Sequence, residues 1–422
     1  MNTALLSLLA LILAVILSGV TRVNVGILAL GFAWLVGHYV AGQPIAFLFD
    51  SFPLNLASML FGVTFLFGIA HQNGSLQRIT YRAARLVRGR AALMPLVFFV
   101  LAVLLSSIGA GNIAAVAILA PMAMATAGEM GISALLMTIM IANGANAGAF
   151  SPIAPTGIIA NSLIQQIGIE MNPWTQVYLP PLVAQTFVAL VSYGIFGGVN
   201  LWRRANHAGP SAYIPPAPLA PVTRVNIVTL LSIAAFIVGV IVFKADAGFL
   251  AIALATILCL LGMGDQEEAI KAVPWSTILM VCGVSVLIAV LQITGGLDLF
   301  TSLLAQVSTL ATVTGVIALA TALLSVYSSS SGVVMPAFIP LVPGLIARLG
   351  GGNPVALVSS INVGSHLVDV SPLSTLGALC IANAPPAEDR DRLFRKLLYY
   401  GLSMSLVSAI VCWLFFGVLL QS

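Results

Sequence analysis

Hydroxyl and amide side chains gather in four short stretches of this sequence, and groups of this kind can bind small ions. The stretches are residues 109–112, 143–156, 328–331 and 362–375, and each interrupts a long apolar run. Their side chains supply hydrogen-bond donors and acceptors without placing a fixed charge in apolar surroundings. We expect the four stretches to form one binding site. The alternative is ordinary kinks, with Ser and Asn side chains holding neighbouring helices together.

Two ionisable residues belong to the last stretch. Asp369 is the one carboxylate that we place deep in an apolar span, and His366 lies three residues before it on the same helical face. A buried ionisable group is a functional candidate, so Asp369 could carry a coupling proton or, ionised, help to hold a cation. A structural pairing of Asp369 with His366 or with the backbone is the alternative. The sequence holds no catalytic triad order, metal cluster or phosphate loop, which argues against an enzyme.

Two Ser-Pro pairs predict where the polar spans break. Proline lacks an N–H and disfavours helix in the residue before it, so the chain should unwind at Ser151-Pro152 and at Ser371-Pro372. A broken helix leaves N–H groups and a partial positive charge at the start of its second half, which suits an anion. Thr156 lies just after the first break and Thr375 just after the second.

Composition identifies the class of protein. Of 422 residues, 60% are hydrophobic and only 7% charged, whereas soluble domains are about one quarter charged. Apolar runs long enough to cross a membrane recur along the whole chain and leave no room for a soluble domain. We predict an all-α polytopic membrane protein whose first run is a retained helix. The four cysteines stand singly in apolar runs and predict small buried side chains.

The order of predicted segments is the same in both halves. The first half, 1–204, comprises scaffold helices at 3–72, an interfacial arm at 74–90, a hairpin at 91–127, a broken helix at 133–166 and a helix at 176–201. A Pro-rich linker at 205–223 follows. The second half, 224–422, comprises scaffold helices at 225–293, an arm at 296–311, a hairpin at 313–347, a broken helix at 355–384 and a helix at 398–420.

Residue matches support the repeat. Leu104, Leu105, Ser106 and Pro121 are matched 219 positions later, and Ser151, Pro152 and Gly157 are matched 220 positions later. Each hairpin has a polar, Gly-rich middle and is predicted to be re-entrant, since irregular backbone at membrane depth must be buried or line a wet cavity. Each half then has five crossings, one of them broken, plus one hairpin. An odd number of crossings predicts inverted-topology repeats, which are typical of secondary transporters.

The basic residues predict the orientation, because they favour the cytoplasmic side of a membrane. With the arm 74–90 in the cytoplasm, 14 of the 16 Lys and Arg residues fall inside, and only Lys244 and Arg348 fall outside. Both termini are then external. The net charge of +4 therefore indicates orientation and not nucleic-acid binding. We expect an integral protein of the bacterial inner membrane.

Two stretches resemble a known family. GVTFLFGIAHQNGSL at 62–76 and the run from AVAILAP at 115–121 to GAFSPI at 148–153 resemble the MatC-type malonate and dicarboxylate carriers of the ion transporter superfamily. The wider resemblance is to the divalent-anion/sodium symporters, whose hairpin tips carry Ser-Asn-Thr ten residues before a Pro. It implies homodimers in which a transport part moves like an elevator against a scaffold.

The resemblance also implies site residues. The tip positions become Gly111, Asn112 and Ile113 in the first half and Ser330, Ser331 and Gly332 in the second. The implied substrate contacts are Asn112, Ile113, Ser151, Pro152, Thr156, Ser330, Ser331, Gly332, Ser371, Pro372, Ser374 and Thr375. The implied sodium ligands are Ser107, Gly111, Asn112, Asn146, Ser325 and Ser331, and in the second half Val326 occupies the position equivalent to Ser107.

The sequence thus predicts a secondary active transporter that carries a small dicarboxylate, such as malonate or succinate, together with a cation. Sodium is the expected coupling ion, a proton at Asp369 is the alternative, and no cofactor is expected. The expected partners are the dicarboxylate, membrane lipid and a second copy of the chain. A cation/proton antiporter and a membrane subunit of a larger carboxylate transporter remain as alternatives.

Overall fold

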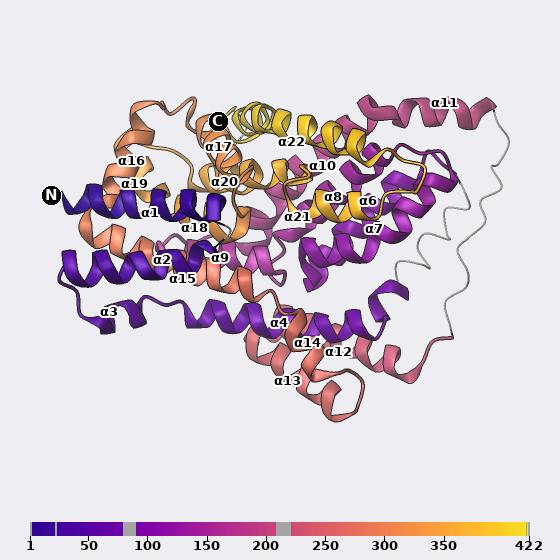
Figure 1. Cartoon of the computed structure of the whole chain (residues 1–422), viewed down its shortest axis with the longest axis horizontal. Coiled ribbons are helices and arrows are strands. Elements are labelled where there is room, and N and C mark those ends of the chain that lie inside the picture. Colours follow the sequence, from indigo (N-terminus) through magenta and orange to yellow (C-terminus); the bar gives the residue numbers. More distant parts are fainter. Residues whose placement is uncertain (1, 22, 79–89, 208–220, 419, 421–422) are drawn as a thin grey trace.

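The computed structural model describes residues 2–21, 23–78, 90–207, 221–418 and 420, and within these ranges the chain is helical without any β-strand. Most helices run along the long axis of the molecule (Figure 1). Nine of the described helices are long and apolar enough to cross a membrane, and four shorter apolar helices accompany them. The fold is therefore that of a polytopic membrane protein, as predicted.

The helices of the first half lie between Thr3 and His207. They are α1 (Thr3–Thr21), α2 (Val25–Ala33) with η1 (Trp34–Val40), α3 (Ile45–Asp50), α4 (Leu54–Gln72), α6 (Met94–Leu105), η2 (Ser106–Ala110), α7 (Gly111–Glu129), α8 (Ala134–Ala149), α9 (Pro155–Gln166), η3 (Pro173–Tyr178), α10 (Leu179–Tyr193), η4 (Gly194–Gly198) and α11 (Val199–His207). The helical segment predicted at 176–201 begins earlier, at Pro173, and ends later, at His207. Residues 79–89 of the predicted arm lie outside the described part of the chain.

The second half contains a further series of helices. Its helices are α12 (Arg224–Ile241), α13 (Ala247–Leu260), α14 (Gln266–Ala272), α15 (Trp275–Thr294), α16 (Gly296–Gln306), α17 (Val313–Ser325), η5 (Ser330–Val334), α18 (Met335–Phe338), η6 (Ile339–Leu341), α19 (Val342–Leu349), α20 (Pro354–Leu367), η7 (Val368–Val370), α21 (Thr375–Ala382), α22 (Arg390–Cys412) and η8 (Trp413–Val418). Most of the predicted linker, residues 208–220, lies outside the described ranges.

One predicted boundary is wrong. The helix expected at 398–420 begins at Arg390, because the Asp389 side chain accepts the backbone N–H of Arg392 at 3.0 Å and caps the helix. The charged residues from Arg390 to Lys396 carried no hydropathy signal, so the sequence placed the start too late.

The helices form two bundles. One contains α1, α2, α4 and α12–α16, in which α2 packs on α15 and α4 packs on α13. The other contains α6–α10, α17 and α20–α22, in which α6 and α7 contact each other and both pack on α8. Contacts of η5 with α15, and of α9 and η2 with α4, join the bundles. The polar stretches of the sequence therefore meet the first bundle at this junction.

Close helix contacts recur at equivalent positions of the two halves. In the first half, a Cβ at Gly144 would lie 2.5 Å from the carbonyl oxygen of Phe99. In the second half, a Cβ at Gly364 would lie 2.6 Å from the carbonyl oxygen of Ala318. Gly364 is 220 positions after Gly144, and Ala318 is 219 positions after Phe99. Between helices of the first bundle, Thr294 Oγ1 donates to Ser7 Oγ at 2.7 Å. A second pair has Asn73, which is 221 positions before Thr294, and Thr229, which is 222 positions after Ser7. In it, Asn73 Nδ2 donates to Thr229 Oγ1 at 2.8 Å.

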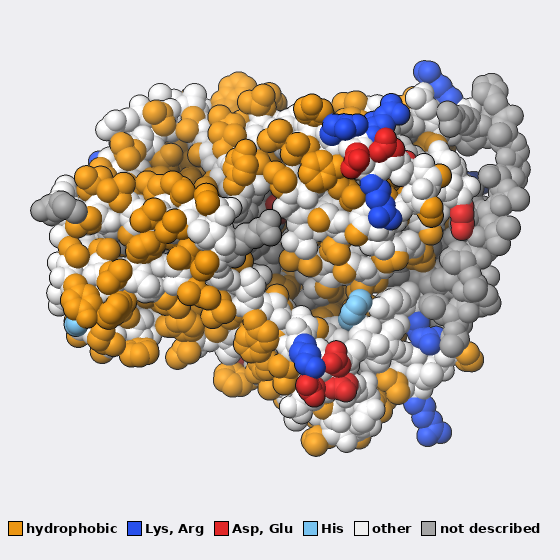
Figure 2. All heavy atoms as spheres, viewed as in Figure 1, with side chains coloured by type: hydrophobic (Ala, Val, Ile, Leu, Met, Phe, Trp, Pro, Cys, Tyr) orange, Lys and Arg blue, Asp and Glu red, His pale blue; other side chains and the backbone are white. Residues whose placement is uncertain are grey.

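Charged side chains are unevenly distributed over the surface. In the view of Figure 2, Lys, Arg, Asp and Glu gather mostly on the half of the molecule away from the N-terminus, while hydrophobic side chains cover the other half. Both chain ends lie toward the hydrophobic half in the same view (Figure 1). In this view, one end of the molecule therefore bears most of the charged side chains of both signs.

Candidate functional site

A cavity of about 1070 Å³ lies at the junction of the two bundles. Helices α1, α2, α4 and α15 form one wall, through residues such as Ser18, Thr64 and Ser276. The opposite wall comes from the starts of α7, α9 and α21 and from the segment between α17 and η5. All four polar stretches of the sequence therefore contribute to one cavity.

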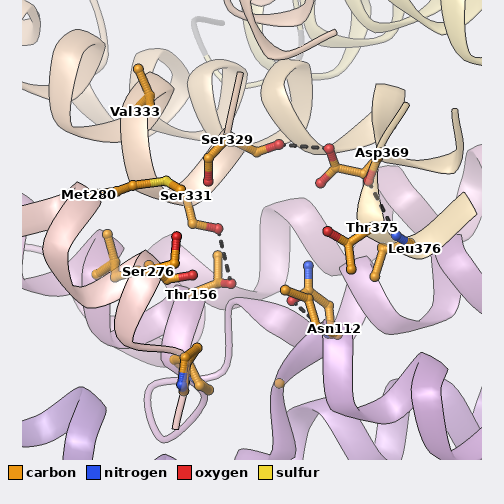
Figure 3. A pocket seen from close by; sticks show the side chains of 18 of the residues that line it. Asn112, Thr156, Ser276, Met280, Ser329, Ser331, Val333, Asp369, Thr375 and Leu376 are labelled. Atoms are coloured by element: carbon orange, nitrogen blue, oxygen red, sulfur yellow. Dashed lines mark hydrogen bonds between the residues drawn. The ribbon is translucent and has the colours of Figure 1, made fainter. Parts of the chain in front are cut away.

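Four helix N-termini meet at this cavity. Asn112 is the second residue of α7, Thr156 is the second residue of α9, and Thr375 is the first residue of α21. Ser330 begins η5, from which helical backbone continues to Leu349. In Figure 3 the side chains of Asn112, Thr156, Ser331 and Thr375 surround a common space. An N-terminus carries about +0.5 of an elementary charge, so four sum to about +2.

The two breaks have the same local construction. The polypeptide leaves the helix at Phe150 and resumes it at Pro155, and it leaves at Val370 and resumes at Thr375. A Cβ at Gly157 would lie 2.0 Å from the carbonyl oxygen of Ser151, and a Cβ at Gly377 would lie 2.2 Å from that of Ser371. Only glycine allows each second half-helix to approach its break this closely. The breaks therefore fall where the Ser-Pro pairs predict them.

The first polar tip is held by an amide pair. Gly109 and Gly111 have φ values of 119° and 78°, which let the chain turn sharply between α6 and α7. Beyond the turn, Asn112 Nδ2 donates to Asn146 Oδ1 at 2.9 Å. Asn146 Nδ2 in turn donates to the carbonyl oxygen of His366 at 2.9 Å. This chain of bonds ties the first tip to both broken helices.

The second polar tip is held by ionisable side chains. Ser331 Oγ lies 3.2 Å from His366 Nε2 and 3.4 Å from Thr156 Oγ1. Ser330 Oγ donates to Asp369 Oδ1 at 2.7 Å and lies 2.6 Å from Ser325 Oγ. Asn112 lies 219 positions before Ser331, and Asn146 lies 220 positions before His366. Equivalent contacts thus hold the two tips with different chemistry.

The cavity is poor in fixed charge. Among its described lining residues, Asp369 is the single carboxylate and His71 the single histidine, and no Lys or Arg lines it. The described part of the chain also contains no group of three or more His, Cys, Asp or Glu that could hold a metal ion such as zinc. The cysteines are free thiols, three of them buried. Helix ends and hydroxyls therefore dominate the electrostatics of the cavity.

The predicted site residues divide into two groups. Those that line the cavity are Gly111, Asn112, Ile113, Thr156, Ser325, Ser330, Ser331, Asp369, Ser374 and Thr375. Those that do not line it are Ser107, Asn146, Ser151, Pro152, Gly332, His366, Ser371 and Pro372. Ser107 Oγ bonds instead to Tyr178 Oη at 2.8 Å and to the carbonyl oxygen of Gly148 at 3.4 Å.

Sequence reasoning missed the wall opposite the tips. Thr64 and His71 on α4, and Ser276 and Thr277 on α15, line the cavity. Single hydroxyls in apolar helices gave no usable signal, since the same residues commonly bond to their own helix. Thr64 Oγ1 does so, donating to the carbonyl oxygen of Leu60 at 2.6 Å. Tyr327, beside the second tip, was also missed.

Comparison with known proteins finds a family match over the first part of the chain. Residues 1–149 match the model of the "Dicarboxylate carrier protein MatC N-terminus" family, which confirms over this region the resemblance found in the sequence. No curated protein sequence matches the chain. The family match identifies a transporter and not an enzyme.

Two solved transporters share the fold. The Alcanivorax borkumensis YdaH transporter has a TM-score of 0.57 and 17% identity, with 88% of this chain and 87% of that chain covered. Neisseria gonorrhoeae MtrF, described as illuminating a class of antimetabolite efflux pumps, has a TM-score of 0.56 and 14% identity, with coverages of 91% and 84%. At these identities the similarity establishes a shared fold.

Proposed function

We propose that this MatC-like membrane transporter is a secondary active carrier that moves a small dicarboxylate, such as malonate or succinate, together with sodium. The observation that carries this proposal is the meeting of four helix N-termini at a cavity whose described lining has no Lys or Arg. Their summed partial charge of about +2 matches a dianion in size. Hydroxyls at Thr156, Ser331, Ser374 and Thr375 supply donors for carboxylate oxygens, while the Ser330 hydroxyl donates to Asp369.

Coupling to a cation follows from the charge of the substrate. Moving a dianion into a cell that is about 100 mV negative inside costs about 4.6 kcal/mol, and each monovalent cation moved with it returns about 2.3 kcal/mol. Two cations therefore balance the dianion, and a third drives accumulation. Because helix dipoles do not travel as net charge, the cations must be bound by the carrier during transport.

We place the sodium ion beside the first tip. Asn146 Oδ1 lies there, 2.9 Å from Asn112 Nδ2, and the turn at Gly111 and the hydroxyl of Ser107 are close to Asn112 in sequence. Oxygen ligands of this type suit a hard cation. Ser325 and Ser331, the sodium ligands implied for the second half, already bond to Ser330 and His366, and we place no sodium between them.

We further propose that the halves are inverted repeats and that transport is elevator-like. The contacts that recur at offsets of 219 to 222 positions support the repeat. The two bundles support a scaffold, which includes α2, α4, α13 and α15, and a transport part that carries the tips and broken helices. Exposed hydrophobic side chains on α2, such as Ile27, would face lipid or the second copy of a homodimer.

The proposed orientation places the charged end of the molecule in the cytoplasm of a bacterial cell and both termini outside. The cavity wall then comes from the cytoplasmic ends of the first bundle, at Ser18 on α1, His71 on α4 and Ser276 on α15. This arrangement corresponds to an inward-facing state. Uptake is the proposed direction; the description of MtrF as an efflux pump makes export the second candidate.

Transport into liposomes tests the proposal. Purified protein is reconstituted, pH is clamped, and uptake of labelled malonate is followed with an inward sodium gradient, with sodium equal on both sides, and with choline in place of sodium. We expect accumulation only with the gradient. Counterflow, in which unlabelled malonate inside exchanges for labelled malonate outside, detects the carrier in either direction. Folded protein that shows neither accumulation nor counterflow of any small dicarboxylate contradicts the proposal.

A further inference from the structure

We propose that Asp369 is a proton-binding site whose occupation is linked to binding of the dicarboxylate, so that a proton at the second tip is a coupling ion in addition to sodium at the first. The inference rests on the proposed substrate class for its linkage, and on the contacts of Asp369 alone for the site itself. It assigns the two tips to two different ions.

The carboxylate is placed to exchange protons with the cavity. Asp369 is 8% exposed and lines the cavity directly. Its Oδ1 accepts the hydroxyl of Ser330 at 2.7 Å, and Ser330 Oγ lies 2.6 Å from Ser325 Oγ. Because Oδ1 is already engaged, the proton would bind Oδ2, and the carboxyl group would pass from a charge of −1 to neutral.

Among the described residues, no Lys or Arg forms an ion pair with this carboxylate. Helices α8, α17, α20, α21 and α22 pack against η7, which carries Asp369. α8 and α17 bear no titratable side chain, α20 bears His366 and α21 bears Cys380. The titratable side chains of α22 are Tyr399, Tyr400 and Cys412 and, in its first two turns, Arg390, Asp391, Arg392, Arg395 and Lys396. His366 directs its ring nitrogens to Asn362, Ser365 and Ser331. An isolated charge is costly at such a place, and a bound proton removes it.

The acid is not required by the architecture of the broken helix. The equivalent position in the first half, 220 residues earlier, is Ala149, and the position equivalent to Ser330, 219 residues earlier, is Gly111. Both halves break at the same place and pack with the same Gly-to-carbonyl contact, so the first half manages without a carboxylate. Asp369 therefore adds a charge to the cavity that the fold does not need.

Electrostatics then links the proton to the substrate. An ionised Asp369 cancels about half of the roughly +2 that four helix ends provide, and it repels a dianion in the same cavity. The dianion thus binds more tightly when Asp369 is protonated. By linkage, a bound dianion must equally raise the affinity of Asp369 for a proton. One proton is taken up with the substrate and is released again when the substrate leaves.

The first experiment needs no substrate. A carbodiimide reacts with a protonated carboxyl group, and mass spectrometry locates the adduct. We expect labelling of Asp369 in detergent-solubilised protein that declines tenfold per pH unit above a midpoint. Ser330→Ala removes a bond to the ionised form and should move the midpoint upward by about 1 to 2 pH units. An absence of labelling at every pH, in wild type and in this variant, overturns the proton site. Labelling that sodium suppresses at fixed pH would make the site a sodium site instead.

The second experiment counts protons during binding. Calorimetry of malonate binding in buffers of different ionisation enthalpy, at pH values where malonate itself is fully ionised, should give about one proton taken up per malonate by the wild type. Asp369→Asn should take up none, while the exposed carboxylate variant Glu129→Gln should behave as the wild type. Equal uptake by Asp369→Asn contradicts the linkage. If no dicarboxylate binds but the carbodiimide labels Asp369 as expected, the proposed substrate class is wrong and the proton site stands.

Discussion

Replacing Gly377 by Ala is the sharpest test of how the broken helices build the cavity. The new Cβ would lie 2.2 Å from the carbonyl oxygen of Ser371, 2.6 Å from its carbonyl carbon and 2.6 Å from the carbonyl oxygen of Val370. Unstrained C···O contacts are about 3.3 Å or longer. The atoms must therefore separate by about 1 Å, and all three neighbours are backbone, so no side chain can rotate away.

The separation displaces the start of α21, which carries Ser374 and Thr375 into the cavity. Overpacking of this kind costs about 1–3 kcal/mol. If the strain falls on the substrate-bound state, the loss of dicarboxylate affinity is about 5- to 150-fold. Gly157→Ala should behave alike, since its Cβ would lie 2.0 Å from the carbonyl oxygen of Ser151.

Malonate affinity, measured by calorimetry on purified protein alongside the thermal unfolding midpoint, is the assay. The matched control is Gly31→Ala in α2, where a Cβ would meet no atom within 4 Å. It should leave affinity unchanged and not lower the unfolding midpoint, because Ala favours a helix over Gly. If Gly377→Ala and Gly157→Ala both retain the affinity of Gly31→Ala, the starts of the half-helices do not shape the binding site.

Three further predictions concern single side chains. Asn112→Ala removes the donor to Asn146, which costs about 1–3 kcal/mol, and should abolish sodium-stimulated uptake without unfolding the protein; full sodium stimulation would contradict the assignment. Tyr178→Phe removes the 2.8 Å bond to Ser107 and should raise the sodium concentration for half-maximal uptake about 2- to 10-fold; no change would separate Ser107 from the ion. The backbone N–H that Asp389 accepts lowers the pKa of its carboxyl group, so its stabilisation of α22 is present at neutral pH and is lost as pH falls through that lowered pKa. The unfolding midpoint of Asp389→Asn should therefore fall less on acidification than that of the wild type, and equal declines would contradict this.

The positions of the breaks could be predicted because they depend on local chemistry. Proline after Ser151 and after Ser371 removes a helical hydrogen bond and disfavours helix in the residue before it, and the helices restart at Pro155 and Thr375. The long apolar spans were predictable for a similar reason, since crossing a membrane demands about 20 apolar residues in sequence. The match of both halves in order and offset could also be obtained by comparing the sequence with itself.

The direction in which each polar side chain points could not be predicted. Ser107 and Asn112 are five residues apart, yet Ser107 bonds to Tyr178 behind the tip while Asn112 lines the cavity. The turn at Gly109, with a φ of 119°, changes the direction of the Asn112 side chain relative to that of Ser107, and the spacing of residues in a regular helix does not predict this change. Ser276 was missed for a different reason, because its place in the cavity depends on the long-range contact of α15 with η5.

The location of bound substrate tests the central claim most directly. A cryo-electron microscopy map of the protein with saturating malonate and sodium, compared with a map in choline without malonate, should show added density between Asn112, Thr156, Ser331 and Thr375, at the four helix N-termini. Unchanged density in this cavity, with malonate bound elsewhere on the protein, would contradict the account.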